Sequence, residues 1–213
     1  MNLDKIKSTL LDDGYCVIEN YVEIPQSALV IADSLMRDYS YKVGRSYKTD
    51  NPFSLPPTLL SLVYNENIKR LFEDVCPTIG CRDVFITHEY KNEEMERNNW
   101  LHFDRLRCLK AMVYLTDVNK NCGPLSVVPG SHRKGSELRN SFKNAPSYEE
   151  KKNRIEIDYP ELEVEFSPLT GSAGTLILFD TDTFHKGGDV LQHHERKIIR
   201  SHWYPDYAWR VGS

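Results

Sequence analysis

Apolar residues recur with two different periods along the chain. Up to about residue 76 the spacing is helical, and from about residue 83 onward the period is two, with turn residues crowded between short segments. Recurrence every three or four residues predicts an amphipathic helix, whereas strict alternation predicts a half-buried strand. The order of the two patterns therefore predicts helices first and strands later, an α+β chain that is mainly β.

The N-terminal part predicts several helices that flank a sheet. Helical spacing is present over residues 3–11, from Pro25 to about residue 39, over 57–64 and over 68–75, with a short strand at 15–21. Gly14 is a typical helix stop, and proline is well placed in a first helical turn. Residues 40–57 show no sustained period and predict a loop, for which a connector and a lid remain alternatives.

The later part predicts many short strands. They are expected at 84–91, 100–104, 108–115, 125–128, 162–166, 175–179 and 196–204. Such a run separated by turns is typical of a barrel or sandwich, and we expect a mainly antiparallel jelly roll, a cupin-like double-stranded β-helix flanked by the N-terminal helices. We expect one domain over residues 1–213, with a polar surface insertion at about 134–159.

Composition narrows the class of protein. The chain has 27 Lys and Arg against 31 Asp and Glu, a formal charge of -4, without a basic tail. This balance argues against a nucleic-acid partner. No stretch approaches the roughly 20 apolar residues of a membrane span, and the start lacks a signal peptide, so we expect a cytoplasmic protein with no membrane partner. Five cysteines without a CxxC spacing favour reduced thiols.

The candidate chemistry begins with His102 and Asp104. On an extended segment, side chains two residues apart emerge on the same face, so these two would converge on one point. A third donor from a distant strand would complete two imidazoles and one carboxylate, the set that suits non-haem Fe(II). His185, which follows a strongly apolar strand, is the best candidate. The chain has five other histidines, for which a structural or surface role is the simpler interpretation. They are His88, His132, His193, His194 and His202.

Four motifs in order resemble the phytanoyl-CoA dioxygenase-like family. They are His102-Phe-Asp104, residues 121–132 (Asn-Cys-Gly-Pro-Leu-Ser-Val-Val-Pro-Gly-Ser-His), residues 174–179 leading to His185, and residues 196–203 (Arg-Lys-Ile-Ile-Arg-Ser-His-Trp). The opening Asp13-Gly-Tyr-Cys-Val-Ile18 is also similar, so the resemblance spans nearly the whole chain. It implies an Fe(II)- and 2-oxoglutarate-dependent oxygenase.

The resemblance also implies the residue roles. His102, Asp104 and His185 would bind iron, and Arg196 would grip the far carboxylate of 2-oxoglutarate. A dicarboxylate needs a planar cation for bidentate pairing, which guanidinium supplies better than ammonium. Arg200 lies on the same strand face and is the competitor for this role. Further contacts with the cofactor or substrate are expected from Tyr90, Lys91 and Met112.

The expected reaction is hydroxylation of a small molecule with O2, releasing succinate and CO2. Halogenating relatives carry a small residue in place of the carboxylate ligand, whereas this chain keeps Asp104. Two alternatives stay open: a catalytically silent metal-binding jelly roll that acts as a sensor or interaction module, and a cupin metalloenzyme that does not use 2-oxoglutarate. The sequence does not indicate an oligomeric state.

The charge of the substrate is a separate question. Five cations lie near the predicted site or in the loop at 40–57, namely Arg45, Lys48, Lys91, Arg105 and Arg107. If they gather at the mouth of the cavity, they favour an anionic substrate. The alternative is that they are solvated loop charges.

Overall fold

Two antiparallel sheets form the framework of the molecule. The computed structural model describes residues 2–41, 44–90, 100–142 and 153–206. Within these residues the larger sheet has the order β1-β8-β5-β10-β4-β3-β2 and the smaller has the order β7-β6-β9. The strands of the larger sheet are β1 (Tyr15–Ile18), β2 (Ser40–Tyr41), β3 (Gly44–Thr49), β4 (Ile79–Tyr90), β5 (Leu109–Tyr114), β8 (Leu176–Asp180) and β10 (Glu195–Pro205). Those of the smaller sheet are β6 (Leu125–Val127), β7 (Ser167–Leu169) and β9 (His185–Gly187).

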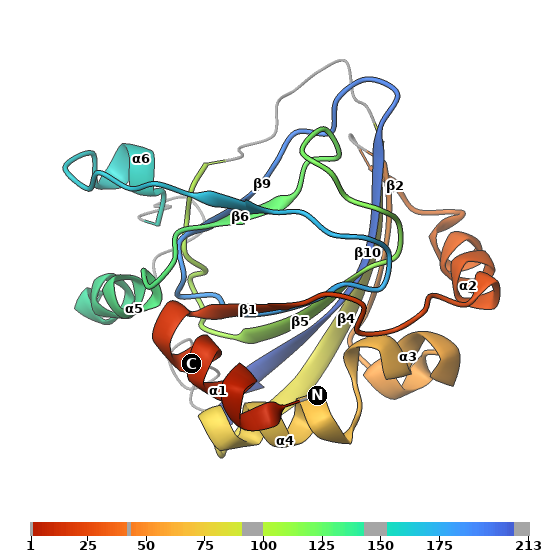
Figure 1. Ribbon diagram of the computed structural model, residues 1–213, viewed down its shortest axis with the longest axis horizontal. Coiled ribbons are helices and arrows are strands. Elements are labelled where there is room, and N and C mark those ends of the chain that lie inside the picture. Colours follow the sequence, from red (N-terminus) through yellow and green to blue (C-terminus); the bar gives the residue numbers. More distant parts are fainter. Residues whose placement is uncertain (1, 42–43, 91–99, 143–152, 207–213) are drawn as a thin grey trace.

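The two sheets face each other and enclose an inner core (Figure 1). Met112 and Tyr114 from β5 and Ile198 from β10 pack there against Leu125 and Val127 from β6. Successive strand residues point to opposite faces, so alternate residues of β5 and β10 are directed inward. This arrangement confirms the predicted jelly roll.

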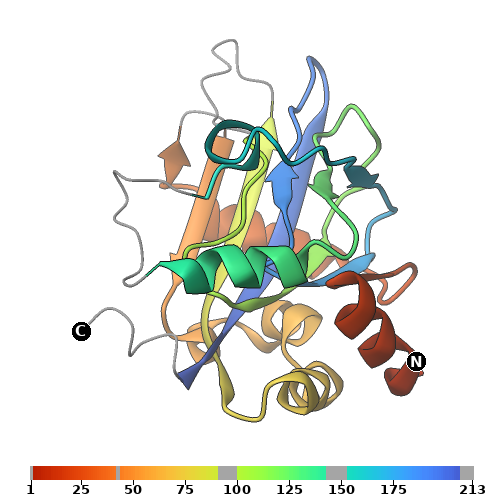
Figure 2. The ribbon, with the colours of Figure 1, turned by 90° about the vertical axis from the view of Figure 1, so that its left-hand side faces the viewer.

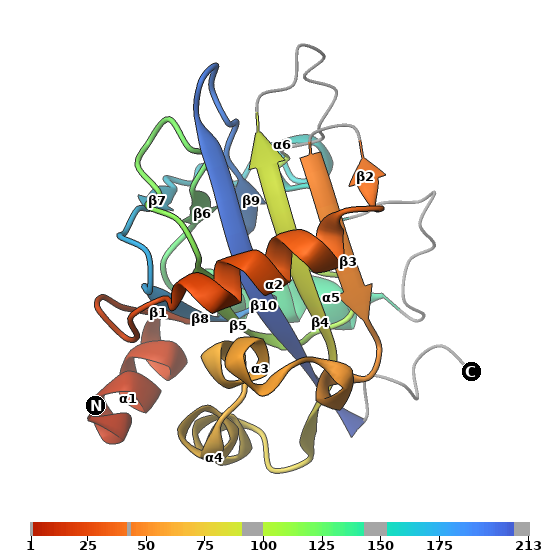
Figure 3. The ribbon, with the colours of Figure 1, turned by 90° about the vertical axis from the view of Figure 1, so that its right-hand side faces the viewer.

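Helices cover the outer face of the larger sheet. They are α1 (Leu3–Asp13), α2 (Gln26–Met36), α3 (Pro57–Val63) and α4 (Glu66–Val75), with a short 3-10 turn η1 (Pro52–Ser54) before α3. Figure 3 shows α2 lying across the strands, with α3 and α4 beside it. Trp203 of β10 anchors the layer, since its ring stacks on Tyr64 at 5.1 Å and meets Phe72 edge-on at 5.4 Å. The predicted helices are therefore present, and they bury the apolar stripes that revealed them.

The segment at 40–57 differs from its prediction. It contains β2, β3 and η1, and β3 extends the larger sheet by pairing with β4 over Gly44–Thr49. The strand reads Gly-Arg-Ser-Tyr-Lys-Thr, and most of its residues are only partly buried or exposed. A strand without an apolar face gives no alternating signal, so its existence depends on the free edge of β4.

Two predicted strands are wrong in detail. Residues 100–104 contain a single bridge position, at His102, rather than a strand. Residues 162–166 do alternate in exposure, but the ladder begins later, with β7 paired to β6. Leu162 and Val164 instead pack against the cluster around Phe103. Alternation reports one buried face, whereas a strand also needs a neighbour with free hydrogen-bonding groups.

The predicted insertion is less separate from the core than expected. It contains α5 (His132–Ser141), which runs across the molecule in Figure 2, and the short α6 (Ile155–Asp158). Ile155 is fully buried with Leu101, Phe103 and Phe184. Residues 143–152, in the middle of this segment, lie outside the described residues. The two ends of this segment thus support the chain on either side of His102 and His185.

A buried histidine at the lower end of β10 predicts a pH dependence of folding. His202 Nδ1 lies 2.8 Å from Asp83 Oδ1, and its ring stacks on Phe85. Burial lowers the pKa of His202 from 6.5 to about 4, although Asp83 opposes this shift. A folded pKa below the unfolded value means that stability is complete above pH 6.5 and is lost as the pH falls toward 4.

We therefore expect the metal-free protein to lose roughly 2–3 kcal/mol of unfolding free energy through His202 between pH 7.5 and 4.5. Denaturant unfolding of wild type and His202→Asn at both pH values measures it. Asparagine keeps an N–H donor toward Asp83 but does not titrate. The unfolding free energy of His202→Asn should therefore fall by roughly 2–3 kcal/mol less than that of wild type between the two pH values. Equal losses in the two proteins would contradict this role.

Candidate metal and cofactor site

A backbone bridge brings the three predicted metal ligands together. His102 N donates to His185 O at 2.9 Å, and His185 N donates to His102 O at 2.7 Å. His185 is the first residue of β9, and Asp104 follows His102 on the same extended segment. His185 Nε2 lies 3.5 Å and His102 Nε2 lies 3.7 Å from Asp104 Oδ1. Two imidazoles and one carboxylate thus converge on one point.

Both imidazoles are held in the tautomer that a metal requires. His102 Nδ1 lies 2.8 Å from Trp100 O, and His185 Nδ1 lies 2.7 Å from Thr183 O. A carbonyl oxygen only accepts hydrogen bonds, so each Nδ1 carries the proton and each Nε2 keeps its lone pair. Such outer contacts fix the orientation of metal-binding histidines.

The local charges keep His102 and Asp104 ready to coordinate. Burial and the neighbouring His185 lower the pKa of His102 to about 4, so its ring is neutral at pH 7. Burial alone would raise the pKa of Asp104, but Lys110 and the two histidines hold it well below its usual value. Metal ligands must be neutral imidazole and ionised carboxylate. The protonation states of these two groups match that need.

The donor set also fits an ion in size. Metal bonds of about 2.0–2.2 Å at right angles place neighbouring donors about 3 Å apart. The ligand atoms of His102, Asp104 and His185 all lie within 4.8 Å of one another. A small inward movement would close them around an ion. Two histidines and one carboxylate with open positions are the set that suits Fe(II).

The loop between β8 and β9, which delivers His185, is fixed from two sides. Gly14, with φ of 80° at the end of α1, accepts a hydrogen bond from Asp180 N at 2.9 Å. Arg139 of α5 pairs with both carboxylate oxygens of Asp182, at 2.8 and 2.9 Å. Burial raises the pKa of Asp182 in spite of this cation. The segment before His185 is therefore rigidly held although it is not itself a strand.

A cavity of about 350 Å³ adjoins the three ligands, inside the barrel. Its lining comes from β4, β5, β6, β8, β9 and β10 as well as from the segment that carries His102 and Asp104. The lining residues are Glu89, His102, Asp104, Lys110, Met112, Leu125, Phe179, His185, Gly187, Arg196, Ile198 and Arg200. A volume of this order accommodates a small molecule.

Arg196 is the most deeply buried cation of the cavity. Its guanidinium pairs with Glu89, which stands opposite it on β4, and it donates to Gly123 O. Within the described part of the chain, the buried Arg196 Nε has no hydrogen-bond partner. A fixed planar cation with an unused donor suits a carboxylate ligand. Arg200, the competitor, lines the same cavity four residues along β10, where its guanidinium lies 5.0 Å from the Phe85 ring centroid.

The structure separates the other predicted cofactor contacts. Met112 lines the cavity opposite Arg200. The expectation for Tyr90 is corrected, because this residue does not line the cavity. Its neighbour Glu89 does, while Tyr90 is 40% exposed and packs against His88. The alternation of β4 explains the error, since adjacent residues face opposite sides. Lys91 lies outside the described residues.

Two functional neighbours were missed at the sequence level. Lys110 Nζ lies 2.7 Å from Asp104 Oδ2, and Glu89 pairs with Arg196. Period two on β5 places Lys110 on the same face as Met112, which was a usable signal. Nothing in the spacing of Glu89 pointed to its partner, because the pairing depends on the register of β4 and β10.

For the described members of the cation group considered from the sequence, the structure favours the alternative of loop charges over a cluster at the cavity. Arg107 pairs with Asp180 at 2.6 Å, and Lys48 pairs with Asp50 at 2.5 Å on the surface. Neither of them, nor Arg45 or Arg105, is among the residues that line the described cavity. Charges in loops are readily neutralised by neighbours that sequence order does not reveal. The cations that do reach the cavity come from strands.

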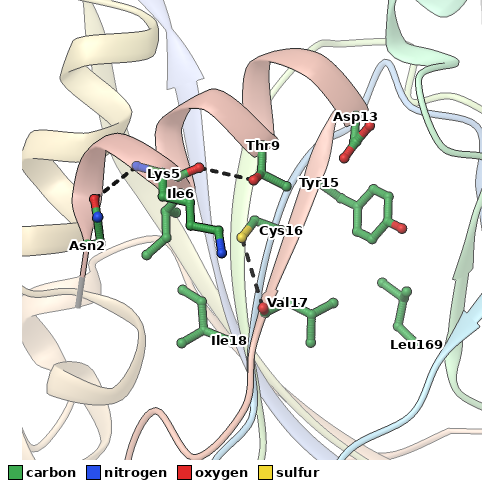
Figure 4. A pocket seen from close by; sticks show the side chains of 10 residues that line it. All are labelled: Asn2, Lys5, Ile6, Thr9, Asp13, Tyr15, Cys16, Val17, Ile18 and Leu169. Carbon is green, nitrogen blue, oxygen red and sulfur yellow. Dashed lines mark hydrogen bonds between the residues drawn. The ribbon is translucent and has the colours of Figure 1, made fainter.

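A second hollow lies outside the barrel, between α1 and β1 (Figure 4). It is mainly apolar, with walls from Ile6, Val17, Ile18 and Leu169. Its lining contains no histidine. It does not share a residue with the metal-site cavity.

All five cysteines are free, and burial raises the pKa of Cys108 to about 12. Among the described helices, none is long and apolar enough to cross a membrane.

Fold and site together define a jelly-roll protein in which two histidines and one carboxylate are placed so that they could hold a metal ion. The family model described as phytanoyl-CoA dioxygenase (PhyH) matches residues 87–198, more than half of the chain. The chain belongs to the phytanoyl-CoA dioxygenase family. The matched range contains all three metal-site donors and Arg196, so the family expected from the sequence is confirmed.

Curated relatives align over a shorter stretch. The ectoine dioxygenase of Bordetella bronchiseptica (strain ATCC BAA-588 / NCTC 13252 / RB50) is 33% identical over 87 residues, which cover 38% of this chain and 28% of the relative. The ectoine dioxygenase of Stutzerimonas stutzeri (strain A1501) is 34% identical over 94 residues, covering 38% and 29%. The match thus spans less than a third of these relatives' length.

Solved structures share the fold over most of the chain. The epimerase SnoN from nogalamycin biosynthesis, in complex with Fe3+, alpha ketoglutarate and nogalamycin RO, has a TM-score of 0.68 at 15% identity and covers 95% of this chain and 83% of that one. EctD from S. alaskensis with bound Fe has a TM-score of 0.64 at 18% identity, covering 94% and 76%. At this identity the likeness establishes the fold, which is that of known Fe(II)/2-oxoglutarate proteins.

Proposed function

We propose that the protein is an Fe(II)- and 2-oxoglutarate-dependent dioxygenase that hydroxylates a small molecule and releases succinate and CO2. The observation that carries the proposal is the convergence of His102, Asp104 and His185 beside a cavity that also contains the buried Arg196. Family membership supports the same reaction class.

In this proposal His102 Nε2, His185 Nε2 and Asp104 Oδ1 hold the iron. Their outer contacts keep the two rings from turning away, since both Nδ1 atoms are held by carbonyl oxygens, and Lys110 holds the second oxygen of Asp104. Bound Fe(II) and 2-oxoglutarate together supply the O2-dependent oxidising power that the side chains themselves lack.

Arg196 binds the far carboxylate of 2-oxoglutarate. Glu89 and Gly123 O hold its guanidinium in place, so little side-chain entropy is lost when a ligand binds. Met112, Phe179 and Ile198 supply apolar walls beside these charges. Burial of Arg196 strengthens the attraction between its guanidinium and a carboxylate.

The substrate is proposed to be anionic. The cavity lining contains three cations, Lys110, Arg196 and Arg200, against two carboxylates, Glu89 and Asp104. A divalent metal and dianionic 2-oxoglutarate cancel, so one positive charge remains in the loaded cavity of a protein whose overall charge is -4. A positive cavity raises the local concentration of anions. Cations from strands thus take the place of the loop cations that the sequence suggested as one alternative.

Hydroxylation is the proposed outcome because the carboxylate ligand Asp104 is present. The fold alone leaves the outcome open, since similar structures include an epimerase and a carbocyclase. A silent sensor would not need the buried Arg196, and a cupin without 2-oxoglutarate would not need it either.

The proposal is tested by a substrate screen with succinate as the readout. Protein loaded with Fe(II) and 2-oxoglutarate is given small carboxylates and phosphates, each paired with its neutral ester, at low and high salt. We expect O2-dependent succinate with the charged forms and a hydroxylated product, with a preference that weakens as salt rises. Equal turnover of acid and ester at low salt would refute the anionic class. A chlorinated or epimerised product would refute hydroxylation.

A further inference from the structure

We propose that Lys110 is a positioning residue that limits Asp104 to binding the metal through one oxygen. The inference rests on the proposed metal site and deepens it. It concerns how many coordination positions the protein leaves open, which the identity of the three ligands does not decide.

The two oxygens of Asp104 have different partners. Oδ1 faces both histidines, at 3.5 Å from His185 Nε2 and 3.7 Å from His102 Nε2. Oδ2 accepts a hydrogen bond from Lys110 Nζ at 2.7 Å. The carboxylate therefore presents one oxygen to the metal position and the other to an ammonium group.

The sheet, rather than a loop, places this ammonium. Lys110 lies inside β5, opposite Phe179 of β8 and His202 of β10. Its Nζ lies 5.5 Å from the Phe179 ring centroid, and its side chain is only 12% exposed. A buried lysine needs a charge partner, and its contact with Asp104 supplies one. The position of Nζ is thus fixed before any ligand enters.

The number of open positions follows from this contact. Carboxylates bind metals through one oxygen or two. If one oxygen of Asp104 and two imidazoles held a six-coordinate ion, three positions would remain, enough for 2-oxoglutarate bound through two atoms and one more ligand. If Asp104 bound through both oxygens, one of those positions would be lost. Lys110 occupies Oδ2 and so keeps the third position open.

If Lys110 has this role, its replacement should change the affinity for the metal and the affinity for 2-oxoglutarate in opposite directions. In Lys110→Met the positive charge beside the metal is gone and Asp104 is free to use both oxygens, so a divalent ion should bind at least as tightly as in wild type, and up to about tenfold more tightly. The same loss of an open position should weaken 2-oxoglutarate by at least about tenfold. A merely structural role of Lys110 would weaken both ligands together.

The chain offers a matched control and a rescue. Lys197 is also a largely buried lysine in an ion pair, 2.6 Å from Asp33 Oδ1, but Asp33 belongs to α2 on the outer face of the sheet. Lys197→Met should change neither affinity. Lys110→Arg keeps a charged N–H donor and should restore 2-oxoglutarate binding. Lys110→Gln is uncharged and shorter than lysine, and it should repeat the methionine result with a polar side chain.

The test uses Co(II) as the metal, because its visible spectrum reports coordination number. Calorimetry gives the Co(II) affinity of each variant and then the 2-oxoglutarate affinity of the Co(II)-loaded protein. We expect unchanged or tighter Co(II), weaker 2-oxoglutarate and an altered Co(II) spectrum in Lys110→Met and Lys110→Gln. Unchanged 2-oxoglutarate affinity, or a parallel loss of both ligands, would overturn the role of Lys110. Failure of wild type to bind Co(II) would refute the metal site itself, and this role with it.

Discussion

Alanine in place of His102, Asp104 or His185 is expected to abolish tight Fe(II) binding. Each change removes one of three protein donors that converge within 4.8 Å of one another. Removing only an outer partner of a metal ligand typically costs 10- to 100-fold in affinity, so loss of a ligand itself should cost at least about 100-fold. Anaerobic titration of each variant with Fe(II) measures the effect.

The control for this prediction is His193→Asn. His193 is exposed and has φ of 66°, a conformation that asparagine tolerates. Its Fe(II) affinity should equal that of wild type. If all three alanine variants kept wild-type affinity, the ligand assignment would be wrong.

Arg196→Lys should weaken 2-oxoglutarate by about 100-fold while leaving Fe(II) affinity nearly unchanged. Arginine presents a rigid planar fork that pairs with a carboxylate through two hydrogen bonds, whereas lysine presents a single flexible ammonium. The loss of one charge-assisted contact and of the fixed geometry amounts to about 3 kcal/mol. Retaining the positive charge avoids leaving the buried Glu89 without a cation.

The matched variant is Arg200→Lys, on the same strand and in the same cavity. It should reduce 2-oxoglutarate affinity far less than Arg196→Lys does. Calorimetric titration of both metal-loaded variants decides between the two arginines. A large loss in Arg200→Lys with none in Arg196→Lys would show that the cosubstrate points the other way along β10.

The sequence predicted most of the framework because the long helices and central strands bury one face. Leu71 and Phe72 of α4 and Val113 of β5 reveal their elements through the same apolar contacts that stabilise them. β3 was missed since its polar residues bury no common face, and it exists through hydrogen bonds to β4. Backbone hydrogen bonds between strands do not by themselves impose a pattern of apolar and polar side chains.

The candidate site was likewise predicted only in part. His102 and Asp104 were predicted from their spacing, and His185 and Arg196 from the order of motifs. The partners of these residues were missed, because the contact of Lys110 with Asp104 spans a bend in the chain and the contact of Glu89 with Arg196 depends on the register of a sheet. The sequence also did not show that Arg107 pairs with Asp180, which comes from a strand far along the chain.

The central claim is that one chain binds one Fe(II) and one 2-oxoglutarate and uses them with O2. The direct measurement loads the protein anaerobically with Fe(II), titrates 2-oxoglutarate to stoichiometry, and then admits O2 together with ascorbate, which supplies the two electrons that a hydroxylated substrate would otherwise give, and follows succinate. We predict one 2-oxoglutarate bound per Fe(II), and succinate that forms only after O2 is admitted and does not form in Asp104→Ala. Fe(II) binding without any binding of 2-oxoglutarate, or no succinate after O2 from a protein that holds both, would contradict it.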